Sequence, residues 1–234
     1  MTRPVVAIDG PAGAGKSTVT KRVADELGYL LVDTGALYRA VALAAQRASV
    51  SWDDPDALGD LAYALVNERA VQLGSQKSSG FTVKLRGEDV SLAIREPSVS
   101  QGASKVSAVP AVREALLDMQ RQAGAAGGVV LEGRDIGTVV FPNAEAKFFL
   151  TASVDIRAQR RFDELLARGG LPLLAEVKRE VAERDFRDSN RPIAPLKQAS
   201  DAQIIDSSVL TIDQVVARIV NRVREVEAEL GAHE

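Results

Sequence analysis

A glycine-rich segment near the start of the chain carries residue types that bind phosphate. Gly10, Gly15, Lys16 and Ser17 match the pattern G-x-x-x-x-G-K-[ST] without a mismatch. The glycines let backbone N–H groups turn towards a phosphate, and a following helix adds the partial positive charge of its N-terminus. In such loops the lysine contacts the β- and γ-phosphates of a nucleoside triphosphate, and the serine hydroxyl contacts Mg²⁺. The pattern predicts a nucleotide-binding loop of Gly10, Pro11, Ala12, Gly13, Ala14, Gly15, Lys16, Ser17 and Thr18.

Arginine is concentrated in one later part of the chain. The sequence has 21 arginines and 8 lysines, and eight of the arginines lie within residues 157–191. Arg184, Arg187, Asp188 and Arg191 are spaced so that one helix would place them on one face. A solvent-exposed stripe is the ordinary interpretation of such a pattern. Beside a triphosphate loop, however, the planar guanidinium forks favour neutralisation of a transferred phosphoryl group.

Polar residues also follow two apolar stretches that we expect to be buried strands. Arg134 and Asp135 come shortly after residues 129–131, and Thr34 and Arg39 come shortly after residues 29–32. In open α/β sheets, ligands bind at the carboxyl ends of the strands. We therefore expect these residues at a binding site, with Thr34 also able to cap the helix that follows.

The composition excludes several kinds of chemistry. There is no cysteine, so disulfides and thiolate metal sites are ruled out, and the single histidine, His233, lies in the charged C-terminal tail. The formal net charge of −3 does not favour binding to a nucleic-acid polymer or a membrane surface. No apolar run reaches the roughly 20 residues of a membrane span. We expect a cytoplasmic protein that acts on small molecules, as a monomer.

The alternation of short apolar stretches and amphipathic segments predicts a parallel sheet with crossover helices. An alternating segment at residues 70–107 interrupts this order and predicts a small antiparallel insertion. Glycine-rich turns at residues 74–80 and 169–170 predict mobile loops. The expected strands are residues 5–9, 29–32, 129–132, 146–150 and 203–205, and the expected helices are residues 17–27, 35–47, 54–66, 110–123, 153–166, 173–190 and 210–230.

Five segments together resemble the bacterial cytidylate kinases. They are GPAGAGKST at 10–18, VDTGALYR at 32–39, SKVSAVPAVREALL at 104–117, LEGRDIGTVVFP at 131–142 and ERDFRDSNRPIAPL at 183–196. The phosphate loop alone would not separate one nucleotide kinase from another, whereas the fourth and fifth segments are far more specific. The resemblance extends from the first strand to the last helix.

The resemblance implies an α/β P-loop kinase fold with a five-stranded parallel sheet flanked by helices. The core would comprise residues 1–33 and 114–234, and residues 34–113 would bind the monophosphate. That region would include a β-rich insertion at about 66–107, and residues 157–174 would form a short lid. The implied reaction transfers the γ-phosphoryl group of ATP to CMP or dCMP with Mg²⁺.

The resemblance also assigns roles to individual residues. It places Lys16 and Ser17 on the ATP phosphates and metal, and leaves open whether Glu132, where some members have aspartate, contacts the metal. Around the acceptor it implies contacts to the phosphate from Arg39, Arg134, Arg184 and Arg191, to the base from Ser104, Arg113 and Asp135, and to the ribose from Asp188 and Arg184. Thr34 stands where some members have serine, and Arg157 and Arg161 would lie near the transferring phosphates.

Two alternatives remain open at this point. Another P-loop kinase of small molecules, acting on UMP, dTMP or shikimate, would share the phosphate loop. A nucleotide-dependent switch of the GTPase kind would share it too, but its N-K-x-D guanine motif is absent from the sequence. A switch hydrolyses its nucleotide alone, whereas a kinase needs a second substrate.

Overall fold

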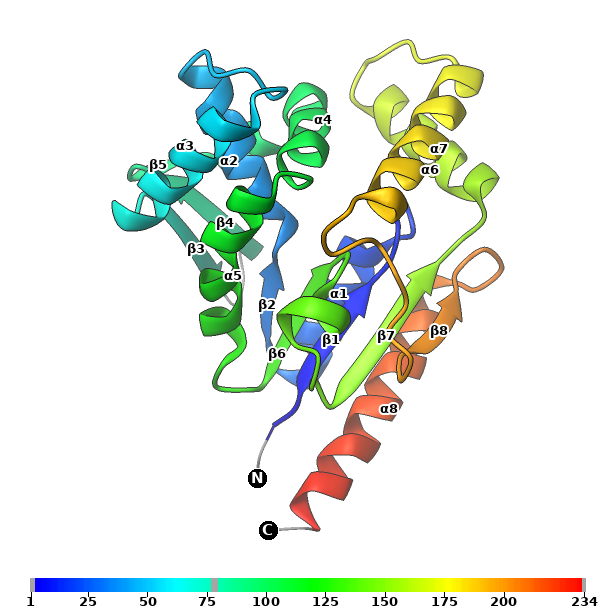
Figure 1. Ribbon diagram of the computed structural model, residues 1–234. Helices are drawn as coiled ribbons and strands as arrows, with labels where there is room; N and C mark the ends of the chain where they lie inside the picture. The colour runs from blue at the N-terminus through cyan, green and yellow to red at the C-terminus, as the bar shows by residue number, and fades with distance from the viewer. Residues whose placement is uncertain (1–2, 77–79, 233–234) are drawn as a thin grey trace.

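The computed structural model describes residues 3–76 and 80–232. Residues 77–79, within the loop at 74–80 that we expected to move, lie outside the described residues, as does His233. Five parallel strands form the central sheet in the order β2-β6-β1-β7-β8, which confirms the expected sheet (Figure 1). These strands are β1 (Val5–Asp9), β2 (Leu30–Asp33), β6 (Val129–Gly133), β7 (Ala146–Thr151) and β8 (Gln203–Asp206).

Side chains of successive residues on β1 enter two different cores. Val6 and Ile8 pack against α1 (Lys16–Leu27) and α8 (Ile212–Gly231) on one face of the sheet. Ala7 points to the other face, which is covered by α5 (Pro110–Gly124) and the short π-helical turn η2 (Ile136–Val140). Because β1 is buried on both faces, its sequence is a continuous apolar run up to Asp9. The phosphate loop therefore starts from a fixed strand.

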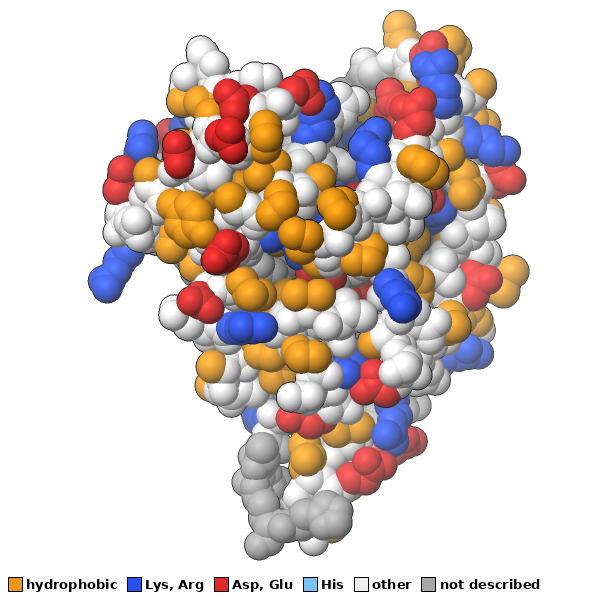
Figure 2. All heavy atoms as spheres, in the orientation of Figure 1, with side chains coloured by type: hydrophobic (Ala, Val, Ile, Leu, Met, Phe, Trp, Pro, Cys, Tyr) orange, Lys and Arg blue, Asp and Glu red, His pale blue; other side chains and the backbone are white. Residues whose placement is uncertain are grey.

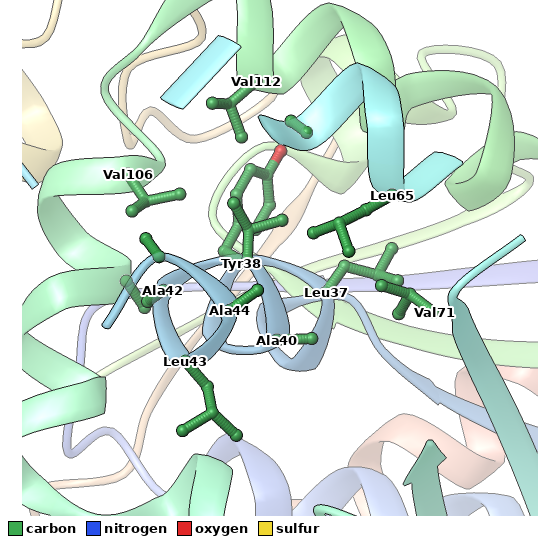
Figure 3. Close-up of a cluster of buried hydrophobic side chains, with 14 of the residues drawn as sticks. Leu37, Tyr38, Ala40, Ala42, Leu43, Ala44, Leu65, Val71, Val106 and Val112 are labelled. Carbon is green, nitrogen blue, oxygen red and sulfur yellow. The ribbon is translucent and has the colours of Figure 1, made fainter. Parts of the chain in front are cut away.

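A second core is built around α2 (Gly35–Arg47), whose buried residues are mostly alanine with Leu37, Tyr38, Val41 and Leu43 (Figure 3). The small alanines let neighbouring elements approach α2 closely. These neighbours are α3 (Pro55–Asn67), α4 (Pro97–Val106), the short 3₁₀ helix η1 (Ala93–Arg95), part of α5, and the antiparallel strands β3 (Val71–Gln76), β4 (Gly80–Leu85) and β5 (Glu88–Asp89). We call this unit the α2 region.

The insertion in the α2 region differs from our expectation in its second half. The antiparallel pairing of β3 with β4 agrees with the alternating pattern. Residues 97–106, which we had included in the β-rich stretch, instead form the helix α4. Its Gly102 lies against the ring of Trp52, where a Cβ atom would come within 2.5 Å of the indole. Tertiary packing, more than local propensity, therefore accounts for this helix.

Helices α6 (Val154–Ala167) and α7 (Leu174–Asn190) form a hairpin that projects beyond the carboxyl ends of the strands (Figure 1). Both helices agree with the expected ranges. Of the described residues, only Ala158, Val177 and Val181 form the buried cluster of this hairpin. The expected lid of residues 157–174 covers most of α6 and the turn after it. No helix in the described part of the chain is long and apolar enough to cross a membrane.

Candidate active site

The loop between β1 and α1 has the backbone shape that the glycine pattern predicts. Gly10, Gly13 and Gly15 all have positive φ values, of 151°, 77° and 91°. A Cβ atom on Gly10 would lie 1.9 Å from the carbonyl oxygen of Leu150 in the neighbouring strand β7. Only glycine therefore fits at that position. The loop then passes directly into the N-terminus of α1 at Lys16.

The side chain of Lys16 folds back over the phosphate loop. Its Nζ donates to the carbonyl oxygens of Gly10 and Pro11, at 2.7 Å in both cases. Burial, reinforced by the charge of Arg134, lowers the pKa of Lys16 well below its ordinary value. A buried ammonium group in this setting gains from a nearby anion. The geometry is suited to phosphate.

Glu132, at the end of β6, contacts the start of α1. Its carboxylate accepts hydrogen bonds from the hydroxyls of Ser17, at 2.9 Å, and Thr20, at 3.3 Å. Burial and the nearby charge of Asp33 raise the pKa of Glu132 to about 7. A carboxylate beside a serine hydroxyl provides the oxygen ligands that Mg²⁺ prefers. Among the described residues no group of three acidic, histidine or cysteine side chains could hold a metal, so phosphates and water would complete the shell.

Thr34 follows directly after β2, the strand next to β6, and Arg39 lies near the start of α2. The Thr34 hydroxyl donates to the Glu132 backbone oxygen at 2.8 Å and does not cap α2, which corrects that part of the sequence prediction. Arg39 pairs with Asp33 at 2.5 Å. The Arg39 Nε is buried without a hydrogen-bond partner in the described structure, and an incoming anion would satisfy it.

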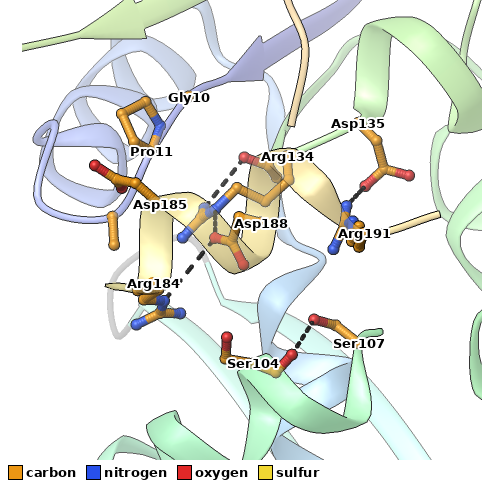
Figure 4. A network of polar contacts seen from close by, with 12 residues as sticks. Gly10, Pro11, Ser104, Ser107, Arg134, Asp135, Arg184, Asp185, Asp188 and Arg191 are labelled. Carbon is orange, nitrogen blue, oxygen red and sulfur yellow. Dashed lines mark hydrogen bonds and ion pairs between the residues drawn. The ribbon is translucent and has the colours of Figure 1, made fainter. Parts of the chain in front are cut away.

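Three charged residues from two separate segments meet above the sheet. Asp188 of α7 accepts from Arg134 Nε at 2.9 Å and lies 4.0 Å from Arg184 Nε (Figure 4). Burial and the neighbouring Arg134 lower the pKa of Arg184 to about 10. Burial acts in the other direction on Asp188, but the two guanidiniums hold the pKa of its carboxyl below the ordinary value. The positive charge at this point exceeds the negative charge.

Asp135 is the centre of a second buried cluster. One carboxylate oxygen accepts from Arg113, and the other accepts from Arg191 Nη2 at 3.3 Å. The Arg113 guanidinium lies over the ring of Tyr38, 5.4 Å from its centroid. Burial raises the pKa of Asp135, although the arginines oppose this shift. Because each carboxylate oxygen has two lone pairs, Asp135 can still accept a further hydrogen bond.

Ser104 faces this part of the site from α4 (Figure 4). Its hydroxyl is buried and has no hydrogen-bond partner in the described structure. Buried hydroxyls are normally paired, so this one indicates a missing polar partner. A substrate group would supply it.

The two arginines that we expected near the transferring phosphates have different surroundings. Arg157 is buried and forms a bidentate pair with Asp185, at 2.6 and 2.9 Å. Arg161 pairs with Glu164 at 2.8 Å and is partly exposed. Arg161 is close enough to lower the pKa of Arg184. Arg157 thus contacts Asp185 of the hairpin and also the carbonyl of Ala12 in the phosphate loop, whereas Arg161 lies at the side of the site.

One residue that we did not single out from the sequence is Asp9. Its carboxylate accepts hydrogen bonds from the backbone N–H groups of Ile136 and Gly137, both at 2.8 Å. Burial raises the pKa of Asp9 to about 6, in spite of these two bonds. Asp9 thus fixes the turn that carries Arg134 and Asp135. The sequence did contain a signal for Asp9, because a carboxylate at the end of a buried strand and next to the phosphate loop indicates a residue of the site.

The described site collects cationic groups from several elements around the carboxyl ends of β1, β2 and β6. In the space-filling view, the upper edge of the molecule is hollowed between the α2 region and the α6–α7 hairpin, with Lys and Arg side chains along it (Figure 2). Such a site can hold two anions and neutralise charge between them. The sequence has no cysteine, and no histidine lies among the described residues of the site.

Comparison with known proteins agrees with this geometry. The family model described as cytidylate kinase matches residues 6–225. A cytidylate kinase from Citrifermentans bemidjiense is 50% identical over 94% of this chain and 93% of its own length. One from Geobacter sp. (strain M21) is 51% identical over the same shares of the two chains.

Proposed function

The chain belongs to the cytidylate kinase family, and on that premise we propose how its residues transfer the γ-phosphoryl group of ATP to CMP or dCMP. The products are ADP and CDP or dCDP. The observation that carries the assignment of the acceptor site is the cluster of Ser104, Arg113 and Asp135 beside the group of arginines. It combines an unpaired hydroxyl, a buried carboxylate and a guanidinium, the groups that one base would need.

Cytosine offers an amino donor at N4 and acceptors at N3 and O2. Asp135 can accept from N4, while Arg113 and Ser104 can donate to N3 and O2. Uracil presents an oxygen in place of the amino group, so a carboxylate opposite it would leave both acceptors unsatisfied. Asp135 therefore favours cytosine. Asp188, which lies beside Arg134 and Arg184, would contact the ribose of the acceptor.

The phosphate of the acceptor would take over the arginines that now bind carboxylates. Arg39 belongs to α2 and Arg134 follows β6. On the opposite side, Arg184 belongs to α7 and Arg191 follows that helix. Arg39 Nε and Arg184 Nε are buried and unpaired among the described residues, which leaves them available to an anion. Contact from both sides would align the acceptor oxygen with the donor.

Lys16 would leave the two loop carbonyls and bind the β- and γ-phosphates of ATP. Phosphoryl transfer needs little acid–base help, because positioning and charge neutralisation account for most of the rate. The arginines of the hairpin neutralise the charge on the transferring group. Ser17 would hold Mg²⁺, with Glu132 orienting the Ser17 hydroxyl, and the metal would supply positive charge to the donor phosphates.

The experiment that tests this function measures ADP release with ATP, Mg²⁺ and each of CMP, dCMP, UMP, AMP and dTMP. We expect CMP and dCMP to give the highest kcat/KM. Lys16→Ala is the control for the site, and it should remove activity without unfolding the protein, because Lys16 contacts the loop and not the apolar core. Preference for another acceptor would overturn the assignment, as would ATP hydrolysis that needs no acceptor.

A further inference from the structure

Every carbonyl of the phosphate loop from residue 10 to residue 14 accepts a hydrogen bond from a side chain. Lys16 donates to the first two. Arg157 Nη1 donates to Ala12 O at 3.2 Å, and Arg160 Nη1 donates to Gly13 O at 3.3 Å. The hydroxyl of Ser207 donates to Ala14 O at 3.0 Å. Four side chains, from α1, α6 and the segment after β8, therefore bind the carbonyls of this loop.

These contacts determine where the loop N–H groups point. A trans peptide unit is planar, and its C=O and N–H bonds point in opposite directions. If the carbonyls of Gly13 and Ala14 are held on the outside, the N–H groups of Ala14 and Gly15 point to the inside. Successive inward N–H groups form a concave anion-binding site. Side chains that hold these carbonyls outward therefore also orient the N–H groups that bind the phosphate.

The four donors differ in what they can do when a nucleotide binds. In the proposed reaction Lys16 must leave its carbonyls to reach the phosphates. Arg160 and Ser207 can keep their contacts with the loop when a nucleotide binds, because they also bind each other. Arg160 Nη1 donates to the Ser207 hydroxyl at 3.1 Å, and Nη2 donates to the Ser207 backbone oxygen at 2.8 Å. Ser207 is 5% exposed.

The Ser207 backbone is itself fixed to the central sheet. Its N–H donates to the carbonyl oxygen of Thr151 at the end of β7, at 2.8 Å. The Ser207 hydroxyl therefore has a defined position from which it accepts one hydrogen bond and donates another. Arg160, Ser207 and Ala14 form a continuous chain from α6 through the end of the sheet to the loop.

We propose that Arg160 and Ser207 are positioning residues for the phosphate donor: they hold the Gly13 and Ala14 carbonyls outward so that the loop N–H groups are aligned before ATP binds. This inference rests on the proposed use of ATP and concerns donor binding alone. It predicts a defect that is specific to the donor nucleotide. A purely structural role in the turn after β8 would affect both substrates or only stability.

The test uses Ser207→Ala, with Ser208→Ala as the matched control. Ser208 is the next residue, and its hydroxyl accepts from Ser153 N without touching the phosphate loop. Kd values for ATP, ADP and CMP are measured separately by calorimetry, together with the Tm of each variant. Because one hydrogen bond of this kind is lost, we expect Ser207→Ala to raise the Kd of ATP and ADP about three- to tenfold. The Kd of CMP should change less than about twofold, and Ser208→Ala should leave ATP binding unchanged.

Two further variants keep the test decisive. Ser207→Thr retains the hydroxyl and should restore most of the donor affinity. Arg160→Gln alters a partly exposed side chain, so it should fold even if Ser207→Ala does not, and it should also weaken ATP and not CMP. An unchanged Kd for ATP in folded Ser207→Ala or Arg160→Gln would overturn the proposal, and so would equal losses for ATP and CMP. If wild-type protein bound ATP but not CMP, the proposed function would fail while the ATP measurements still tested the loop.

Discussion

The α2 region and the α6–α7 hairpin face each other across the site, yet they are held together by different interactions. The α2 region encloses a large apolar cluster that includes Leu37 and Val112, both fully buried. The described hairpin buries only Ala158, Val177 and Val181 in its own cluster and exposes Leu171 at its turn. The first region is a packed core, whereas the second is a pair of helices with little apolar burial.

The hairpin is joined to the rest of the molecule largely through charge. Arg134 of the sheet side binds Asp188 of α7, and Asp135 binds Arg191 just beyond that helix. These are the arginines that a phosphate would compete for. A substrate can therefore change how the hairpin is held without disturbing an apolar core. The α2 region, in contrast, should present Ser104 and Arg113 in nearly constant positions.

The largest effect that we expect tests whether the hairpin supplies catalytic charge. Arg184→Ala should lower kcat on the order of 10²-fold, because a guanidinium that neutralises the transferring group is lost. Arg191→Ala should have a comparable effect. Arg187→Ala on the same helix is the control, since Arg187 is exposed, and it should leave kcat within about twofold. Steady-state kinetics with CMP and ATP is the measurement. Wild-type rates in both Arg184→Ala and Arg191→Ala would mean that these arginines form only a solvent-exposed surface of the helix and do not take part in catalysis.

A matched pair of valine substitutions compares the two cores directly. Val112→Ala in the α2 region should lower the free energy of unfolding by about 2.5 kcal/mol, from the lost methyl groups and the cavity left behind. Val181→Ala in α7 should cost only about 1 kcal/mol, because its small cluster can collapse. Urea denaturation measures both values. Equal costs would show that the hairpin is as tightly packed as the α2 region.

A smaller effect concerns the choice of base, which we assign to Asp135 after β6 together with Ser104 and Arg113 of the α2 region. Asp135→Asn should lower activity with CMP and narrow the ratio of kcat/KM for CMP to that for UMP by roughly tenfold. The amide can donate as well as accept, and it binds Arg113 and Arg191 less well. Both acceptors are compared at saturating ATP. If CMP and UMP activity fell by the same factor, base selection would belong to Ser104 and Arg113.

The smallest expected effect is on backbone protection. With CMP and an ATP analogue bound, amide hydrogen exchange in α6 and α7 should slow at least about fivefold, because water is excluded as the hairpin closes. Exchange in α2, which is already enclosed by its core, should change little. Mass spectrometry of peptides from the three helices gives the comparison. Uniform or absent changes would argue for a site that is formed before substrate binds.

Most of the sheet and the phosphate loop could be predicted from the sequence, for local physical reasons. β-branched runs that stop at Asp9 or at Gly133 indicate buried parallel strands, and the glycine spacing specifies a loop that no other residue type could form. The helix α4 could not be predicted, because its serines and Gly102 are weak helix formers and its stability comes from Trp52 and the α2 core. Local patterns contain no information on such packing.

The arginine-rich part shows the same limit for the candidate site. Sequence spacing places Arg184 and Asp188 on one face, and the structure brings them to 4.0 Å. The spacing does not indicate that Arg157 pairs with Asp185 on the adjacent helix, or that Asp135 lies between Arg113 and Arg191. Those pairs depend on how separate elements cross. Arg160 and Ser207 were missed for this reason, since they meet only in three dimensions.

The strand order has a consequence for the distance between the two substrates. In the proposed reaction ATP binds at the phosphate loop after β1, and the acceptor phosphate binds near Thr34 and Arg39 after β2. Strand β6 lies between β1 and β2, with Asp33 opposite Glu132 and Glu132 opposite Ile8. Neighbouring strands are about 4.8 Å apart, so the two loops start about 10 Å from each other. The spacing of the strands therefore sets the separation between the two sites, independently of the side chains that line them. A single inhibitor that joins a cytidine to an adenosine must match its linker to that interval, and a linker that is too short will engage one half of the site only.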